Sequence, residues 1–168
     1  MGEPDLSAEL GSEQAFTERA AEVARALRDA RAWPLVIGLE GDLGSGKTTW
    51  ARAMLRGLGY AGRVPSPTYT LLEQYRCDGL TVVHLDLYRL RVGEELEHLG
   101  LRDWLAEAQC WIAAEWPERA PALADRCDCL IRFAATSETG RRVTISARTP
   151  AGIAALSAVR QRAFNLTP

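Results

Sequence analysis

The residues from Gly41 to Thr49 have the types and spacing of a phosphate-binding loop. Their sequence, GDLGSGKTT, fits the pattern G-x-x-x-x-G-K-[ST]. The apolar run 34–39 before the loop predicts a buried strand, and residues 50–56 after it predict a helix. A loop in this setting directs main-chain N–H groups and the positive end of a helix dipole at one anion. We therefore expect a nucleotide to be held by Leu43, Gly44, Ser45, Gly46, Lys47, Thr48 and Thr49.

Two side chains of the loop are expected to have separate roles. Lys47 would bridge the β- and γ-phosphates, and the Thr48 hydroxyl would take one coordination position on Mg²⁺. Lys47 is the single lysine among 20 basic residues. A compact ammonium fits between phosphates where a planar guanidinium would not, so this composition favours a phosphate ligand over a glycine-rich turn without a ligand.

Two acidic residues stand at the ends of runs that predict buried strands. Asp86 ends one run and Glu115 follows another. Ligands of an open α/β sheet bind beyond the carboxyl ends of its parallel strands, where Asp86 would lie if its strand is next to the strand before the loop. We expect Asp86 and Glu115 to form a Mg²⁺ site with Thr48 and to be catalytic together with Lys47. The alternative for each acid is a solvated carboxylate at a strand end.

Several neighbouring residues have roles that the sequence leaves open. His84 projects from the same face of its strand as Asp86, and it is either part of the site or a structural histidine. Thr68 follows two prolines and is either a ligand of Mg²⁺ or γ-phosphate in a switch loop, or a turn threonine. Arg89 either reaches a phosphate, anchors Asp86, or is a surface arginine. The same question stays open for Tyr88 and Trp116.

The remaining patterns predict one α/β domain. We expect helices over 12–27, 50–56 and 150–162, two short helices within 93–107 broken at Gly100, a short helix or loop at 118–126, and strands over 34–39, 69–76, 80–87, 110–114, 128–134 and 142–147. Asp78-Gly79 between two strands is typical of an antiparallel hairpin. The expected fold is a single P-loop NTPase-like domain over residues 1–168, with a mixed sheet (parallel core plus antiparallel hairpin) flanked by helices. Residues 1–11 and about 163–168 are expected to be loose tails.

The composition is that of an ordinary globular domain. Of the 168 residues, 47% are apolar and 25% are charged. The net charge of −2 argues against a surface built chiefly to hold nucleic acid, although it leaves room for a local basic patch, and we expect no DNA partner. Since no apolar run is long enough to cross a membrane and no signal peptide is evident at the start, we expect a cytoplasmic protein without a membrane partner. The four cysteines lack C-x-x-C spacing, so we expect buried, reduced thiols, with Cys127 and Cys129 on the same side of a strand.

The base of the nucleotide is constrained by what the sequence lacks. Ras-type GTPases recognise guanine with an N-K-x-D motif. That motif cannot be present, because the single asparagine is Asn165 and the single lysine is Lys47. ATP is therefore the expected nucleotide.

Four motifs, taken together, closely resemble the TsaE (YjeE) family. They are the phosphate loop at 41–49, Ser66-Pro67-Thr68-Tyr69, His84-Leu85-Asp86-Leu87-Tyr88-Arg89 and Glu115-Trp116-Pro117. These proteins are bacterial ATPases of the tRNA threonylcarbamoyladenosine modification pathway. The resemblance covers roughly residues 12–148, and the motifs occur in the order typical of the family.

The resemblance implies a function, partners and further site residues. It implies that the protein binds ATP and Mg²⁺ and hydrolyses ATP slowly when alone. The family acts with TsaB and TsaD, whose complex transfers threonylcarbamoyl to an adenosine beside the anticodon of tRNA. The resemblance therefore implies that this protein contacts tRNA only indirectly. It also implies that ATP hydrolysis resets the complex between turnovers. By match, Glu115 would also position the attacking water and Asp86 would lie in the nucleotide–metal region. Glu13, near the adenine, and Arg141 would bind the nucleotide.

Two other functions are compatible with the same loop. One is a small-molecule P-loop kinase, although the acidic segment 93–107 is unsuited to a lid over phosphates. The other is a nucleotide-sensing adaptor, whose ATP state controls assembly and whose hydrolysis is incidental.

Overall fold

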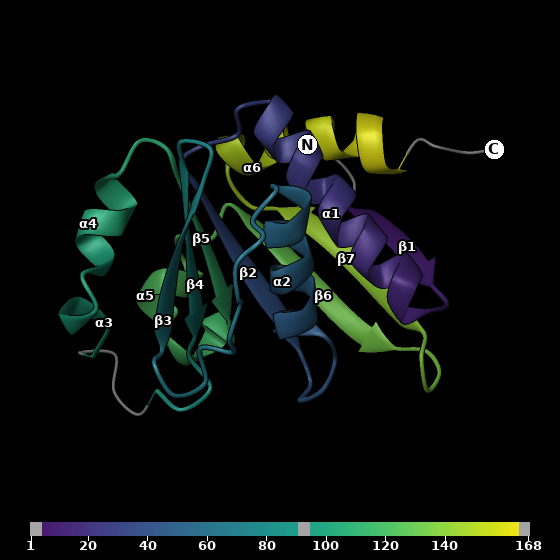
Figure 1. The fold of residues 1–168 in the computed structure, drawn as a ribbon, viewed down its shortest axis with the longest axis horizontal. Coiled ribbons are helices and arrows are strands. Elements are labelled where there is room, and N and C mark those ends of the chain that lie inside the picture. Colours follow the sequence, from purple (N-terminus) through teal and green to yellow (C-terminus); the bar gives the residue numbers. More distant parts are fainter. Residues whose placement is uncertain (1–4, 91–94, 165–168) are drawn as a thin grey trace.

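A seven-stranded sheet forms the centre of the fold, in the order β1-β7-β6-β2-β5-β4-β3 (Figure 1). The structure is a computed structural model, and it describes residues 5–90 and 95–164. The strands are β1 (Leu6–Leu10), β2 (Leu35–Gly41), β3 (Leu72–Cys77), β4 (Leu80–Asp86), β5 (Cys110–Glu115), β6 (Cys129–Ala135) and β7 (Arg141–Ala147). The helices are α1 (Glu13–Asp29), α2 (Lys47–Gly57), α3 (Glu95–His98), α4 (Leu101–Ala106), α5 (Pro121–Ala124) and α6 (Pro150–Val159), with a 3₁₀ turn at Pro117–Arg119 and a π-helical turn at Arg160–Phe164.

The sheet is mixed, as the sequence predicts. Strands β6, β2, β5 and β4 are parallel neighbours, and β3 pairs antiparallel with β4 at one edge. Strands β7 and β1 add two antiparallel strands at the other edge. The condition set for Asp86, that its strand lie next to the P-loop strand, is not met, because β5 lies between β2 and β4. Asp86 instead pairs in register with Glu115 on β5, so both acids lie at the same edge of the sheet.

Local signals place the ends of several elements. The side chain of Ser12 accepts a hydrogen bond from the N–H of Ala15 (3.1 Å) and begins α1, as predicted. Asp78 and Gly79, with φ of +50° and +85°, form the tight turn of the predicted β3–β4 hairpin. Strand β3 begins later than predicted, because Leu71 has φ +61° and is not extended.

Apolar residues of the parallel strands fill two cores, one on each face of the sheet. Along β2, Leu35 and Ile37 join the core that contains residues of α1, α2 and α6, whereas Val36 joins the core that contains Leu123 of α5. All four cysteines are buried and free. The prediction that Cys127 and Cys129 face the same side is wrong, because Cys127 precedes β6, where strand alternation does not apply, and the two thiols lie in different cores.

The amino-terminal segment is not a loose tail. Residues 6–10 form β1, which pairs with β7 and buries Leu6 and Leu10. The run LSAEL is too short and too mixed to predict a strand by itself, and its partner lies at the far end of the chain. At the other end, Ala163 is buried within the π-helical turn, against the expectation of a tail from about 163. Residues 1–4 and 165–168 lie outside the described residues, as do residues 91–94 between β4 and α3.

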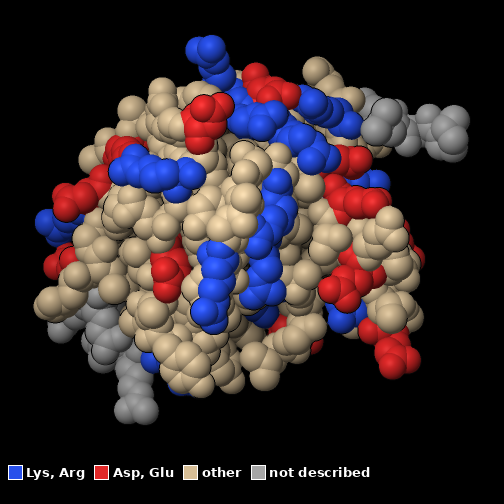
Figure 2. Space-filling view, in the orientation of Figure 1, with Lys and Arg blue, Asp and Glu red and all other residues tan. Residues whose placement is uncertain are grey.

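The surface carries interspersed charges. Figure 2 shows a band of basic side chains over α2 and the adjoining part of α1, with acidic side chains around it. None of the described helices has the length and apolarity needed to cross a membrane.

Candidate nucleotide-binding site

The loop between β2 and α2 has a backbone that requires glycine. Gly41, Gly44 and Gly46 have φ of +155°, +76° and +109°. A Cβ on Gly46 would lie 2.9 Å from Cζ of Phe16, so α1 closes the space behind the loop. The first N–H groups of α2 have no carbonyl partner one turn earlier and are therefore available to an anion.

A cavity of about 410 Å³ lies in front of this loop. It is lined by Leu43, Gly44, Gly46, Lys47, Thr48, Thr49, Thr68, Asp86, Tyr88, Arg89, Glu115 and Trp116. The loop, both strand-end acids and Thr68 thus border one space, although they come from segments far apart in the sequence. Ser45 is buried within the loop and does not line this cavity.

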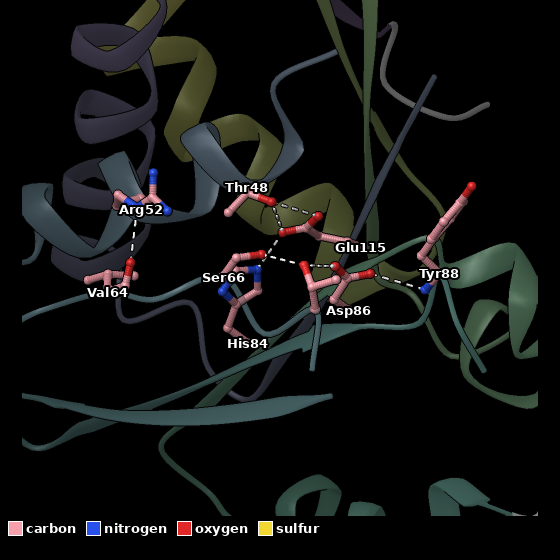
Figure 3. Close-up of polar contacts among 9 residues, drawn as sticks. Thr48, Arg52, Val64, Ser66, His84, Asp86, Tyr88 and Glu115 are labelled. Carbon is pink, nitrogen blue, oxygen red and sulfur yellow. Dashed lines mark hydrogen bonds and ion pairs between the residues drawn. The ribbon is translucent and has the colours of Figure 1, made fainter. Parts of the chain in front are cut away.

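Glu115 accepts hydrogen bonds from two directions (Figure 3). The hydroxyl of Thr48 donates to its Oε1 and Oε2, at 2.8 and 3.0 Å. Nε2 of His84 lies 2.7 Å from the same Oε1. His84 and Glu115 are 1% and 3% exposed. His84, whose role the sequence left open, therefore contacts the site directly.

The carboxylate of Asp86 is held by hydrogen bonds from a main-chain N–H two residues later and from the loop that precedes β3 (Figure 3). Its Oδ1 accepts the N–H of Tyr88 at 3.0 Å, and its Oδ2 accepts the hydroxyl of Thr68 at 3.3 Å. The hydroxyls of Thr68 and Ser66 are 2.6 Å apart. The loop that carries them is held to α2 by Arg52, whose Nε donates to the carbonyl of Val64.

The ammonium of Lys47 is bound by the loop that it serves. Its Nζ donates to the carbonyl oxygens of Gly41 (2.6 Å) and Asp42 (2.9 Å), and it lies 4.0 Å from the centre of the Trp116 ring. Burial lowers the pKa of Lys47, and the nearby carboxylates, led by Glu115, oppose that shift. The carbonyl oxygens occupy the donors that phosphate oxygens would need.

The acids and Thr48 suit Mg²⁺ that arrives with a nucleotide. Carboxylate and hydroxyl oxygens are hard donors, and Mg²⁺ in nucleotide sites takes further ligands from phosphates and water. Thr48, Asp86 and Glu115 line one cavity and offer this donor set. In the described part of the chain, no group of three or more His, Cys, Asp or Glu side chains is arranged to hold a metal ion.

A second cavity of about 210 Å³ lies on the other side of the loop. Glu13 and Arg141 both line it, together with Phe16, Gly44, Gly46, Thr49, Glu138 and Thr139. Gly44, Gly46 and Thr49 also border the first cavity, so the two spaces meet at the loop. Nε of Arg141 donates to the carbonyl of Ser45 at 3.1 Å, which ties β7 to the loop.

Other lining residues could not be found from the sequence. In the sequence, the spacing of Phe16 indicates a core residue of an amphipathic helix, and no motif surrounds Glu138 and Thr139. The rings of Tyr88 and Trp116, which line the first cavity, pack against each other at an interplanar angle of 46°, with their centroids 5.0 Å apart. Taken together, the linings of the two cavities therefore combine residues of the sequence motifs with residues of segments that carry no motif.

A glycine-rich loop between a parallel strand and a helix, facing two carboxylates at the ends of neighbouring strands, defines a P-loop nucleotide-binding protein. A family profile described as "Threonylcarbamoyl adenosine biosynthesis protein TsaE" matches residues 10–143. The chain belongs to the TsaE family, and its role lies in tRNA threonylcarbamoyladenosine biosynthesis.

Two relatives support this assignment, and a solved structure supports the fold. The chain is 42% identical to a TsaE protein of Haemophilus influenzae over 119 residues, covering 70% of this chain and 73% of that protein. It is 33% identical to a TsaE protein of Aquifex aeolicus over 138 residues, covering 81% and 92%. The crystal structure of Bacillus subtilis YdiB superimposes with a TM-score of 0.72 at 22% identity, over 96% of this chain and 97% of that one, which supports the fold.

Proposed function

We propose that this protein is a Mg²⁺-dependent ATPase. The phosphates of ATP bind in the cavity in front of the P-loop. The observation that carries the proposal is the convergence of Lys47, Thr48, Asp86 and Glu115 on that one space. Phosphoryl transfer requires positioning and charge neutralisation more than covalent chemistry, and these are the groups that supply both. We also take residues 1–168 to act as one domain.

Each residue has a defined task in this proposal. Lys47 exchanges the carbonyls of Gly41 and Asp42 for β- and γ-phosphate oxygens. Thr48, whose hydroxyl would leave Glu115, and Asp86 would hold the ion. The chemistry that Mg²⁺ would supply there is neutralisation of the phosphate charge. Glu115, freed from Thr48, orients the attacking water.

The rest of the nucleotide extends to the second cavity. Leu43 to Thr49 hold the phosphates, while Glu13 and Arg141 contact the base and its sugar. Because the sequence lacks the N-K-x-D motif, the base is adenine.

The proposed partners follow from the family rather than from a surface. We expect TsaB-like and TsaD-like proteins to stimulate hydrolysis in the cytoplasm, with tRNA met through their complex and with hydrolysis resetting it between turnovers. No role for DNA or a membrane is proposed.

Phosphate release from ATP, measured with and without a TsaB–TsaD complex, tests the proposal. Wild type should release phosphate slowly alone and faster with the complex, and Lys47→Ala should release none. Near-normal release by Lys47→Ala would refute the site. Transfer of phosphate to a small acceptor would instead indicate a kinase. If Glu115→Gln stops hydrolysis but tRNA modification continues over many turnovers, the protein is a nucleotide-sensing adaptor.

A further inference from the structure

The ring of His84 is placed where a second residue could control Glu115. His84 and Glu115 lie on the neighbouring parallel strands β4 and β5, and His84 pairs in register with Ala113, two residues before Glu115. Side chains in such diagonal positions meet when they are long. Figure 3 shows the imidazole beneath the carboxylate, and Nε2 is 2.7 Å from Oε1.

The hydrogen bond fixes which ring nitrogen carries the proton. We assign Nε2 of His84 as the donor to Glu115, because an ionised carboxylate accepts hydrogen bonds and has none to donate. The other nitrogen, Nδ1, is buried without a hydrogen-bond partner. The ring borders a space of about 10 Å³ whose other lining side chains include Ile37, Met54 and Leu55. A water there would need two to four polar partners, which such a lining does not offer.

A histidine in this position is a poor choice for stability alone. Burying Nδ1 without a partner carries a desolvation cost that a leucine of similar size would avoid. The side chains around His84 on the α2 face of the sheet, among them Val82 and Trp111, are apolar. The benefit that offsets the cost has to come from the one bond that the ring makes, to Glu115.

That bond matters most when a nucleotide is bound. Thr48 and His84 are the two side chains that donate to Glu115 within the described residues. In the function proposed above, the Thr48 hydroxyl turns toward the ion and leaves the carboxylate. His84 is then the remaining side-chain donor to this buried carboxylate within the described residues.

We propose that His84 is the positioning residue of Glu115, which it keeps aimed at the attacking water while Thr48 serves the ion. This inference rests on the proposed ATPase function. His84 touches no phosphate in this scheme, so its loss should lower kcat and leave nucleotide affinity unchanged. A side-chain amide that places its N–H where Nε2 lies should restore kcat.

Three variants test the proposal. His84→Leu removes the donor, His84→Gln keeps one near the position of Nε2, and His84→Asn keeps a polar side chain too short to reach Oε1. We expect kcat to fall about tenfold in the Leu and Asn variants, as loss of one hydrogen bond to a charged group implies, and to recover in the Gln variant. The dissociation constant of ADP without metal should stay at the wild-type value in all three. His98→Gln, which changes the chain's other, exposed histidine, is the matched control.

The outcomes separate the explanations. A purely structural histidine predicts that kcat and ADP affinity fall together, or that Gln rescues no better than Asn, and either result overturns the proposal. So does a kcat for His84→Leu within twofold of wild type. The comparison of Gln with Asn remains decisive if the Leu variant does not fold.

A spectroscopic measurement tests the contact without any turnover. If wild type releases no phosphate, the ATPase proposal fails first. Imidazole ¹⁵N–¹H spectra then test the contact alone. We expect a protonated Nε2 on His84 whose resonance shifts in Glu115→Ala, and an unshifted resonance would overturn the positioning role as well.

Discussion

Replacing Gly46 by alanine should damage the loop through two separate costs. The residue has φ +109° and ψ +13°, a conformation that L-residues adopt at a cost of about 1–3 kcal/mol. The added Cβ would also lie 2.9 Å from Cζ and 3.1 Å from Cε1 of Phe16. Overpacking of this kind costs about 1–3 kcal/mol more. The expected loss of unfolding free energy is the sum, about 2–6 kcal/mol.

Gly44 provides a matched control in the same loop. Its φ is +76°, but a Cβ there would meet nothing within 4 Å, so Gly44→Ala carries the backbone cost alone. In a domain of this size, 1 kcal/mol shifts Tm by about 2–4 °C. A loss of about 3 kcal/mol in Gly46→Ala then lowers Tm by about 6–12 °C, against about 2–4 °C for a loss of about 1 kcal/mol in Gly44→Ala.

Thermal unfolding followed by circular dichroism measures both variants, and a third variant isolates the clash. Phe16→Leu removes the ring that Gly46→Ala would strike, so the double variant should be less destabilised than the sum of the two single changes. Equal Tm values for Gly44→Ala and Gly46→Ala, or strict additivity with Phe16→Leu, would refute the reasoning.

Three further expectations concern the surroundings of the site. Asp128 accepts hydrogen bonds from the N–H of Val36 at 2.8 Å and from the Thr149 hydroxyl at 2.5 Å. Asp128→Ala should therefore lower the free energy of unfolding in urea by about 1–3 kcal/mol and leave ADP affinity unchanged. A loss no larger than that of Asp125→Ala, at an exposed position, would argue otherwise. Burial raises the pKa of both the Cys127 and Cys129 thiols to about 12, so these groups ionise first in the unfolded chain. The free energy of unfolding should therefore fall as pH rises above about 9, by about 1.4 kcal/mol per pH unit for each thiol. An unfolding free energy that stays constant between about pH 8 and about pH 10.5 would contradict this. Arg141→Ala removes a side chain that lines the second cavity and that we propose contacts the nucleotide, so it should weaken ADP binding about tenfold in calorimetry, as loss of a contact worth about 1.4 kcal/mol implies. An unchanged dissociation constant would remove Arg141 from the site.

The sequence predicts those features that depend on neighbours along the chain. The loop at 41–49, the Ser12 cap and the Asp78-Gly79 turn each carry their own chemistry within a few residues, and the structure has all three elements where they are expected. The mixed sheet also follows, because hairpins impose antiparallel pairing and strand–helix alternation imposes parallel pairing.

Features that depend on distant segments could not be predicted in the same way. Strand β1 exists because β7 offers an edge, and its own five residues show too weak an alternation. The insertion of β5 between β2 and β4 is a choice among topologies that local patterns do not rank. That order is also what brings His84 against Glu115, a contact that strand alternation alone left undecided.

Calorimetric titration of ATP with Mg²⁺ tests the central claim most directly, in wild type and in Lys47→Ala. We expect one binding site in the wild-type protein, and loss of that binding when the ammonium that bonds to Gly41 and Asp42 is removed. The claim is contradicted if wild type gives no binding heat at any practical concentration, or if Lys47→Ala binds as tightly as wild type.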